Sequence, residues 1–231
     1  MNKFLLITAK LLPEPILIKA VRYYVNMQIK KHAKLNIQGI ENLNCDLKRP
    51  YLFVCNHLSN SDGLIINKVL EKENITFVAG KKLSANAMTN LGFTIIKSIT
   101  ISPNSADKDA ISKIIHTVKS GTSVLVFPEG TRSRTAQMIA GKKGILLFAK
   151  LTKAPIVPIG IWGTEKFMPI NENMGKESFH DANISINIGK AFVITERRSD
   201  ETKVEWETNT LNFIMKKIAE LIPEEYRGVY K

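Results

Sequence analysis

Residues 51–62 read YLFVCNHLSNSD, an apolar run followed at once by a polar stretch that contains His57 and Asp62. A short apolar run that ends in polar turn residues is typical of a fully buried strand. The histidine therefore follows the end of a predicted strand, with the aspartate five positions further along. An imidazole held by a nearby carboxylate can take a proton from a hydroxyl near neutral pH, so the pair is a candidate general base.

A second motif, FPEGTRS at residues 127–133, follows another apolar run about seventy residues later. Its Gly130 would let backbone amides approach a ligand closely, and Arg132 carries a planar guanidinium that suits phosphate oxygens. Proline and glycine are also ordinary turn residues, so a plain turn is the alternative. Residues 141–144, GKKG, either add positive potential or form a solvated helix start. We favour phosphate as the anion that this part of the chain binds.

Predicted strands and helices alternate along the chain. Apolar runs predict strands at residues 51–55, 75–79, 95–101, 123–127, 156–161 and 184–188, with a weaker candidate at 191–194. Helical spacing appears over residues 64–70, 110–118, 145–149 and 211–222. This alternation predicts an α/β fold, a single domain with a largely parallel central sheet flanked by helices. Ligands of such sheets bind outside the carboxyl ends of the strands, where we expect His57 and Arg132 to face one crevice.

The composition limits the kinds of site that the chain can build. Its 231 residues, 44% of them hydrophobic, are enough for one sizeable core. The only two cysteines, Cys45 and Cys55, fit neither a disulfide framework nor a metal-ligand spacing, so we expect a reducing compartment and no metal site. Cys55 shares a strand face with His57 and could act as a thiolate nucleophile, but we favour a small buried hydrophobe.

The net charge of +12 is concentrated near the N-terminus. Residues 1–35 carry seven lysine or arginine residues against one glutamate, a net +6. Lys10 interrupts the first apolar run, no cleavage site of small residues follows, and no uncharged stretch of about 18 residues is present to span a bilayer. Apolar residues between 16 and 25 recur at helical spacing, which fits either a helix in an anionic bilayer interface or a surface helix packed on the core.

We therefore divide the chain into two parts. Residues 1–35 are expected to form an amphipathic, basic, membrane-associating helical segment, and residues 36–231 the globular domain. We expect a peripheral or monotopic protein at the cytoplasmic face of the membrane, with an anionic membrane surface as its partner.

With these motifs in place, the chain resembles the 1-acylglycerol-3-phosphate acyltransferases, a PlsC-like family of glycerolipid acyltransferases. Four blocks in order carry the likeness, over roughly residues 36–192. They are NHLSNSD at 56–62, GKKL at 80–83 with LGF at 91–93, FPEGTRS at 127–133, and APIVPI at 154–159. A histidine and an aspartate separated by four residues would be a weak signal alone, but their order and distance relative to FPEGTR make the likeness specific.

The resemblance implies a reaction and a set of site residues. A fatty acyl group would pass from acyl-CoA or acyl carrier protein to the free hydroxyl of lysophosphatidic acid, giving phosphatidic acid in phospholipid biosynthesis, without a cofactor or a metal. His57 would be the base and Asp62 its partner, and the acceptor hydroxyl would attack the thioester directly. The residues that would bind the acceptor phosphate or shape its pocket are Lys81, Glu129, Gly130, Thr131 and Arg132.

One departure from the family pattern concerns the acceptor. The second block of the family usually ends in an aspartate–arginine pair after an apolar strand, whereas residues 99–104 here read ITISPN. A missing basic residue could weaken phosphate binding, so another lyso-lipid or a glycolipid stays open as the acceptor. The predicted catalytic pair is untouched by this change.

Two functions of other classes compete with acyl transfer. A non-catalytic polyanion-binding protein would explain the charge, but aromatic residues make up only 7% and no nucleic-acid module is recognisable, so we expect no nucleic-acid partner. A lipid thioesterase or hydrolase could use Cys55, or a water activated by His57.

Overall fold

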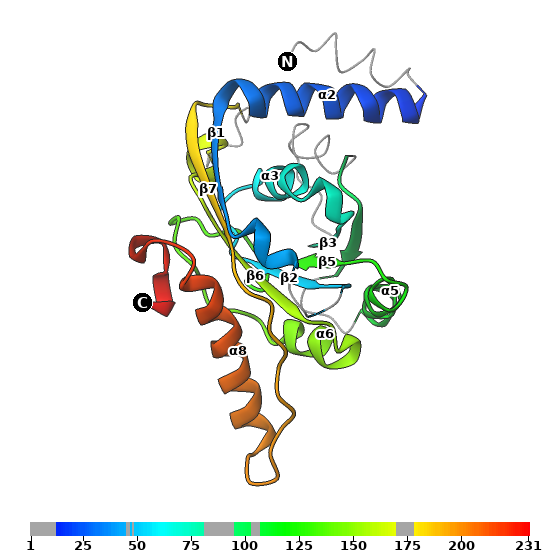
Figure 1. Cartoon of the computed structure of the whole chain (residues 1–231), viewed down its shortest axis with the longest axis vertical. Helices are drawn as coiled ribbons and strands as arrows, with labels where there is room; N and C mark the ends of the chain where they lie inside the picture. Colours follow the sequence, from blue (N-terminus) through cyan, green and yellow to red (C-terminus); the bar gives the residue numbers. More distant parts are fainter. Residues whose placement is uncertain (1–12, 45–46, 48, 81–94, 103–106, 170–177) are drawn as a thin grey trace.

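The computed structural model describes residues 13–44, 47, 49–80, 95–102, 107–169 and 178–231. Within them, seven strands form one sheet in the order β1-β7-β6-β2-β5-β3-β4, between two layers of helices (Figure 1). The strands are β1 (Ala33–Gln38), β2 (Leu52–Cys55), β3 (Thr76–Gly80), β4 (Ser98–Ile101), β5 (Val124–Val126), β6 (Ile156–Trp162) and β7 (Ala182–Ile188). The α-helices are α2 (Glu14–His32), α3 (Asp62–Val69), α5 (Lys108–Lys119), α6 (Gly144–Thr152), α7 (Thr164–Phe167) and α8 (Lys203–Ala219). Short 3-10 turns are η1 (Ile40–Asn44), η2 (Glu71–Glu73), η3 (Glu224–Tyr226) and η4 (Gly228–Tyr230).

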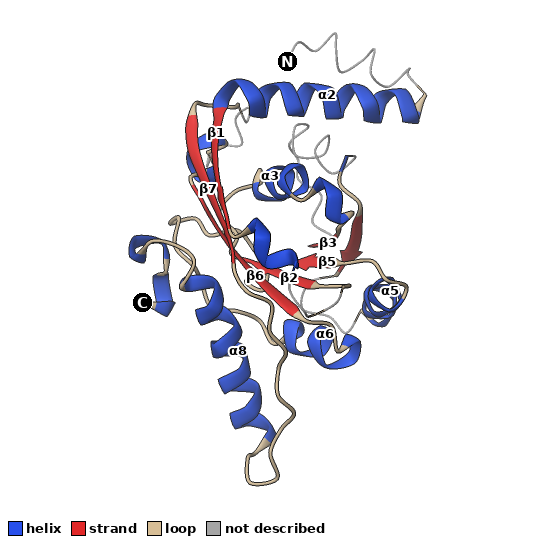
Figure 2. Ribbon diagram, in the orientation of Figure 1, coloured by secondary structure: helices blue, strands red, loops and turns tan. Residues whose placement is uncertain are grey.

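Strand pairing in the sheet is parallel except between β6 and β7. Parallel neighbours need long crossovers, and helices such as α3 and α5 supply them. Figure 2 shows the strands as one twisted sheet with helices on both sides. The prediction of an α/β domain with a largely parallel sheet is therefore confirmed.

Strand β2 shows how the apolar run at residues 51–55 leads to helices on both faces of the sheet. All four of its residues are completely buried. Side chains alternate along a strand, so Phe53 and Cys55 enter the core beneath α2, α3 and α7, while Leu52 and Val54 enter the core beneath α5, α6 and α8. A strand that is apolar at every position must be covered on both faces, and this requirement produces the three layers.

Two predicted features of the sheet need correction. The weak strand candidate at residues 191–194 forms only an isolated bridge between Phe192 and Ile156. Strand β1 was not predicted, because its sequence AKLNIQ alternates apolar and polar residues and contains no continuous apolar run, as suits a partly exposed edge strand next to β7. It also runs across the boundary that we expected between residues 35 and 36.

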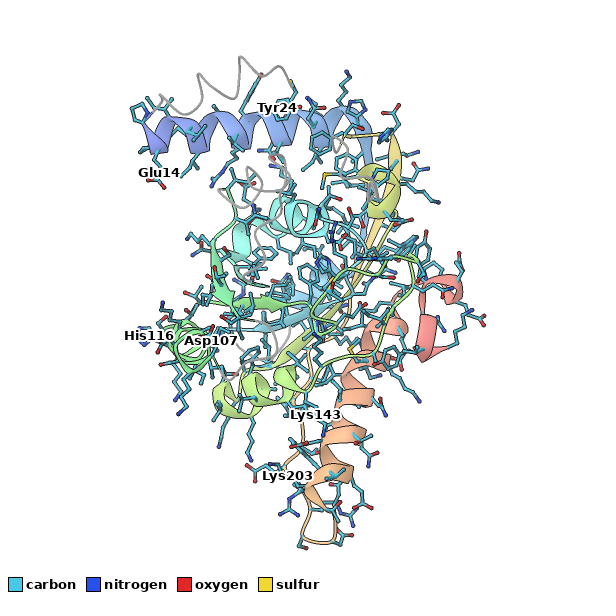
Figure 3. All side chains as sticks on the ribbon, turned by 180° about the vertical axis from the view of Figure 1, so that it is seen from behind. Glu14, Tyr24, Asp107, His116, Lys143 and Lys203 are labelled. Carbon is cyan, nitrogen blue, oxygen red and sulfur yellow. The ribbon has the colours of Figure 1, made fainter. Side chains whose placement is uncertain are left out.

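Helix α2 lies along one side of the molecule, above α3 in Figure 1, and Figure 3 labels Tyr24 on it. Its residues Val21, Val25 and Ile29 are buried in the same core as Phe53 and Cys55, so the predicted apolar stripe packs on the domain. Ile16, Tyr23 and Met27 are exposed on the same helix. Residues 1–12 of the predicted membrane-associating segment lie outside the described residues, and membrane association stays a prediction. None of the helices in the described ranges combines the length and apolar character needed to cross a bilayer.

Gly163 makes the turn from β6 into α7. Its φ of +88° lies in the left-handed region, and a Cβ at this residue would stand 2.1 Å from the carbonyl oxygen of Asn183. Only glycine fits here without moving β7 away from β6.

We predict that Gly163→Ala lowers the free energy of unfolding by more than Gly121→Ala. Gly121 also has a positive φ, +92°, but a Cβ there would meet no atom within 4 Å. The control therefore carries only backbone strain, about 1 to 3 kcal/mol, whereas Gly163→Ala adds a clash with a backbone carbonyl. Urea unfolding followed by circular dichroism measures both. Equal losses for the two variants would show that the Asn183 contact is not restrictive.

Candidate active site

Asn56 fixes the point at which the chain leaves the sheet. Its side chain is completely buried at the end of β2. Its Nδ2 donates to the carbonyl oxygen of Ile161 and its Oδ1 accepts from the N–H of Ile161, both at 2.8 Å. These two bonds tie the end of β2 to β6, so His57 begins a loop with a defined direction.

His57 and Asp62 form the centre of this loop. The imidazole Nδ1 lies 2.8 Å from the Asp62 Oδ2, which also accepts the N–H groups of Leu58 at 2.7 Å and Ser59 at 2.9 Å. The carboxyl oxygen therefore acts as an acceptor, which places the imidazole proton on Nδ1. The other nitrogen, Nε2, is left with its lone pair, as a general base requires.

The serine side chains of this loop bind α7 and the residue after it, and do not cap α3. Ser61 precedes the helix but makes no side-chain capping bond. The Ser59 Oγ donates to the carbonyl of Met168 at 3.0 Å, and the Ser61 Oγ to that of Thr164 at 3.4 Å. These hydroxyls attach the loop to α7, which explains why the Gly163 turn matters for the site.

Phe127 supports the imidazole from one side. The two rings are stacked, with centroids 4.1 Å apart and an interplanar angle of 17°. The stack restricts rotation of the His57 ring, so that its nitrogens keep their directions. Sequence reasoning assigned Phe127 no role, although its place at the head of the second motif marked it.

The Glu129 side chain holds the His57 loop by binding the backbone of that loop. Its side chain is buried, its Oε1 accepts the N–H of His57 at 2.9 Å, and its Oε2 accepts the N–H of Ile139 at 3.0 Å. The N–H of Ser133 in turn donates to the carbonyl of His57 at 2.8 Å. Glu129 thus shapes the pocket from behind by holding the backbone that carries the base.

Burial raises the pKa of Glu129 from 4.5 to about 7. The two backbone N–H bonds lower that pKa, and the negative charge of Asp62 raises it further. The carboxyl group therefore changes its charge near neutral pH.

The C-terminal segment supports the same loop, which no sequence signal indicated. The N–H of Met138 donates to the carbonyl of Tyr226 at 2.8 Å, and the hydroxyl of Tyr230 accepts the N–H of Gly141 at 2.9 Å. Ile139, the partner of Glu129, lies between these two contacts. The last residues of the chain therefore help to hold the backbone that reaches His57.

A cavity of about 420 Å³ lies at the carboxyl ends of β2, β3, β4 and β5, where the fold predicted a site. Its polar lining includes His57, Thr131 and Lys142, and Gly130 belongs to the same wall. Its apolar lining comes from the strands and α6, namely Phe77, Val78, Ala79, Ile96, Ile101, Val126, Phe127, Pro128, Ile145 and Phe148.

The predicted site residues fall into four groups. His57, Gly130 and Thr131 line the cavity, while Asp62 and Glu129 are buried behind it. Arg132 is half-buried on the same loop but does not belong to the cavity lining. Lys81 lies outside the described residues.

Cys55 is not suited to nucleophilic catalysis. It is completely buried in β2, and burial raises the pKa of its thiol well above the ordinary value, with further contributions from the negative charges of Asp62 and Glu129. A buried neutral thiol agrees with the interpretation that we favoured from the sequence. Among the described residues, no three His, Cys, Asp or Glu side chains gather into a metal-binding group.

The comparison with family models decides where this constellation belongs. The model described as Acyltransferase matches residues 34–162, a range that contains the His57 loop, the second motif and the cavity. The chain belongs to the Acyltransferase family. The resemblance read from the four sequence blocks is thereby confirmed at the level of the family.

Individual relatives of this family are similar over part of their length. A chloroplastic 1-acyl-sn-glycerol-3-phosphate acyltransferase of Brassica napus is 32% identical over 154 residues, covering 64% of this chain and 43% of that protein. A protein of the same name from Saccharomyces cerevisiae is 31% identical over 149 residues, covering 62% of this chain and 47% of its own. The chain thus spans less than half the length of these curated relatives.

A solved structure shows the same fold. The crystal structure of the 1-acyl-sn-glycerophosphate acyltransferase PlsC from Thermotoga maritima superposes with a TM-score of 0.62 at 21% sequence identity. The match covers 94% of this chain and 87% of that one.

We predict that stability falls as the pH rises from about 4.5 to about 7, because of Glu129. Its pKa is higher in the folded chain than in the unfolded one, so the folded state binds the proton more tightly. The stabilisation is complete below the unfolded pKa and is lost as the pH passes the folded pKa. Urea unfolding at several pH values measures this slope.

The matched variants for this prediction are Glu129→Gln and Glu224→Gln. Glutamine does not titrate, so the contribution of residue 129 to the pH dependence of stability should vanish in the first variant. The glutamine NH₂ would also face one of two backbone N–H donors, which lowers the free energy of unfolding by about 1 to 3 kcal/mol. Glu224 is exposed and should keep the wild-type slope. A slope that persisted in Glu129→Gln would assign the titration to another group.

Proposed function

We propose that the protein transfers a fatty acyl group from a thioester carrier to the free hydroxyl of 1-acylglycerol 3-phosphate, which gives phosphatidic acid for phospholipid biosynthesis. The observation that carries this proposal is the His57 imidazole, oriented by a buried carboxylate and facing a largely apolar cavity. The names of the relatives support the choice of acceptor. Coenzyme A and acyl carrier protein both remain candidate carriers, and neither requires a further cofactor.

The proposed chemistry is a direct transfer. The acceptor hydroxyl donates a hydrogen bond to His57 Nε2 and gives up its proton as its oxygen attacks the thioester carbonyl carbon. Asp62 stabilises the imidazolium that forms on the other side of the ring. The carbon–sulfur bond then breaks, and the leaving thiolate takes the proton back from the imidazolium. His57 and Asp62 carry out this step. No acyl-enzyme intermediate forms.

In this proposal, the polar and the apolar residues of the cavity bind different parts of the substrates. Apolar side chains such as Phe77, Ile145 and Phe148 suit a fatty chain, because chain and wall are both removed from water there. Following the family resemblance, Arg132 and Lys81 bind the acceptor phosphate. Gly130 and Thr131 form the nearby wall.

Hydrolysis is the reaction from which transfer must be separated. The burial of Cys55 argues against a thiol nucleophile, but a base that activates a hydroxyl can also activate water. Transfer and hydrolysis differ in their products, since the first gives phosphatidic acid and the second a free fatty acid.

We predict that His57→Ala abolishes formation of phosphatidic acid, while Cys55→Ala leaves it largely intact. Loss of a general base lowers the rate by about 10² to 10⁴-fold, whereas the thiol touches no substrate in this mechanism. Mass spectrometry of products from lysophosphatidic acid with acyl-CoA, and separately with acylated acyl carrier protein, measures transfer and identifies the donor. Loss of turnover in Cys55→Ala alone would require direct attack to be abandoned, and free fatty acid as the sole wild-type product would show a hydrolase.

We also propose that the protein works at the cytoplasmic face of an anionic membrane, with α2 as the contact. Deletion of residues 1–35 is a poor test, because it removes Val21, Val25 and Ile29 from the core and part of β1. Substitutions on the exposed side of α2 leave the core in place.

We predict that replacing Lys19, Lys30 and Lys31 together with glutamine weakens flotation with phosphatidylserine vesicles. Each basic residue near such a surface contributes about 1 kcal/mol of attraction. The control removes three exposed lysines of α5, namely Lys108, Lys113 and Lys119, so that net charge is matched. Equal effects of the two triple variants would show that total charge, and not α2, determines binding.

A further inference from the structure

Lys142 is the basic side chain that the described residues bring to the cavity, apart from His57 itself. It stands two residues before α6, and its backbone N–H donates to the carbonyl of Pro128 at 2.8 Å. This hydrogen bond joins the second motif to the residues just before α6, at the cavity wall that His57 also lines.

The side chain of Lys142 lies across Gly130. A Cβ at Gly130 would stand 3.0 Å from the Lys142 Cδ, 3.1 Å from its Cε and 3.2 Å from its Nζ. Gly130 also has a φ of +69°, which favours glycine at this position. The glycine of the second motif therefore leaves the room that the lysine chain occupies, and the ammonium group is held at the cavity wall.

The neighbouring Lys143 has a different role. Its Nζ forms an ion pair of 2.8 Å with Glu207 of α8, and it does not line the cavity. Figure 3 labels Lys143 close to α8. Two consecutive lysines thus separate, one toward the cavity and one toward α8.

Among the described residues, the placement of charges around the cavity favours an anion beside Lys142. Asp62 directs one oxygen to the imidazole and two backbone N–H groups, and Glu129 uses both oxygens for backbone N–H groups. Both carboxylates are buried behind the wall, whereas Lys142 is exposed to the cavity. An ammonium group is a strong point-charge partner for phosphate oxygens.

We propose that Lys142 binds the phosphate of the acyl acceptor inside the cavity and so sets the preference for a phosphate-bearing acceptor over a neutral one. This inference rests on the proposed function. It assigns to Lys142 the contact at the cavity wall, where Arg132 does not belong to the lining. The basic residue missing from the second block is thereby replaced by one from another segment.

The test compares Lys142→Ala with its neighbour, Lys143→Ala. We expect Lys142→Ala to reduce the ratio of kcat/KM for 1-acylglycerol 3-phosphate to that for neutral 1-acylglycerol by about ten-fold or more, which is the value of one charge-assisted hydrogen bond. Lys143→Ala should leave the ratio unchanged, because it removes only a surface ion pair. Lys142→Arg should restore part of the preference, since it keeps the charge.

Three outcomes would overturn the inference. An unchanged ratio in Lys142→Ala would remove the phosphate contact. An equal loss with both acceptors would show a role in holding the wall. A rise in KM for acyl-CoA alone would assign the anion to the phosphates of the donor.

A binding experiment separates this inference from the proposed function. A short-chain 1-acylglycerol 3-phosphate is titrated into the His57→Ala protein by calorimetry, with and without Lys142→Ala. Weaker binding in the double variant supports the phosphate contact even if the wild type fails to transfer an acyl group. Equal binding overturns it even if the wild type is an active acyltransferase.

Discussion

The buried carboxylate of Asp62 is the constraint on which the site depends. A charge without solvent is costly unless it is hydrogen-bonded, and here one oxygen collects the imidazole N–H and two backbone N–H groups. Those donors are available only if the loop after β2 curls around the start of α3. Asn56 holds the beginning of that loop, and Glu129 binds the backbone N–H of His57. The position of the His57 imidazole is therefore determined by buried hydrogen bonds.

The layers of the fold supply the surroundings that these bonds need. Because β2 is buried on both faces, helices cover both sides of the sheet, and the cavity that His57 lines lies beyond the carboxyl ends of the strands. The apolar walls of the cavity are extensions of the same two cores. A site for a fatty chain beside a polar base is therefore a consequence of where the strands end.

Much of this arrangement could be predicted from the chain, for identifiable reasons. Continuous apolar runs mark buried strands, so most of the sheet was predicted, whereas the edge strand β1 alternates apolar and polar residues and has no such run. The spacing of His57 and Asp62 fits a pair within one loop, and the structure places them in hydrogen-bond contact. The roles of Phe127 and of the C-terminal residues were not visible, because each depends on contacts between distant segments. Arg132 was expected at the crevice but does not line the cavity.

The class of fold and the family follow from local patterns in the chain, namely apolar runs between helical stretches and short motifs in a given order. The way in which side chains within those motifs are used depends on tertiary packing. Lys142 and Lys143 are equivalent as letters in a row, yet one lies over Gly130 at the cavity and the other pairs with Glu207. That difference arises from how α6, α8 and the loop after β5 pack together, and periodicity along the chain carries no information about such packing.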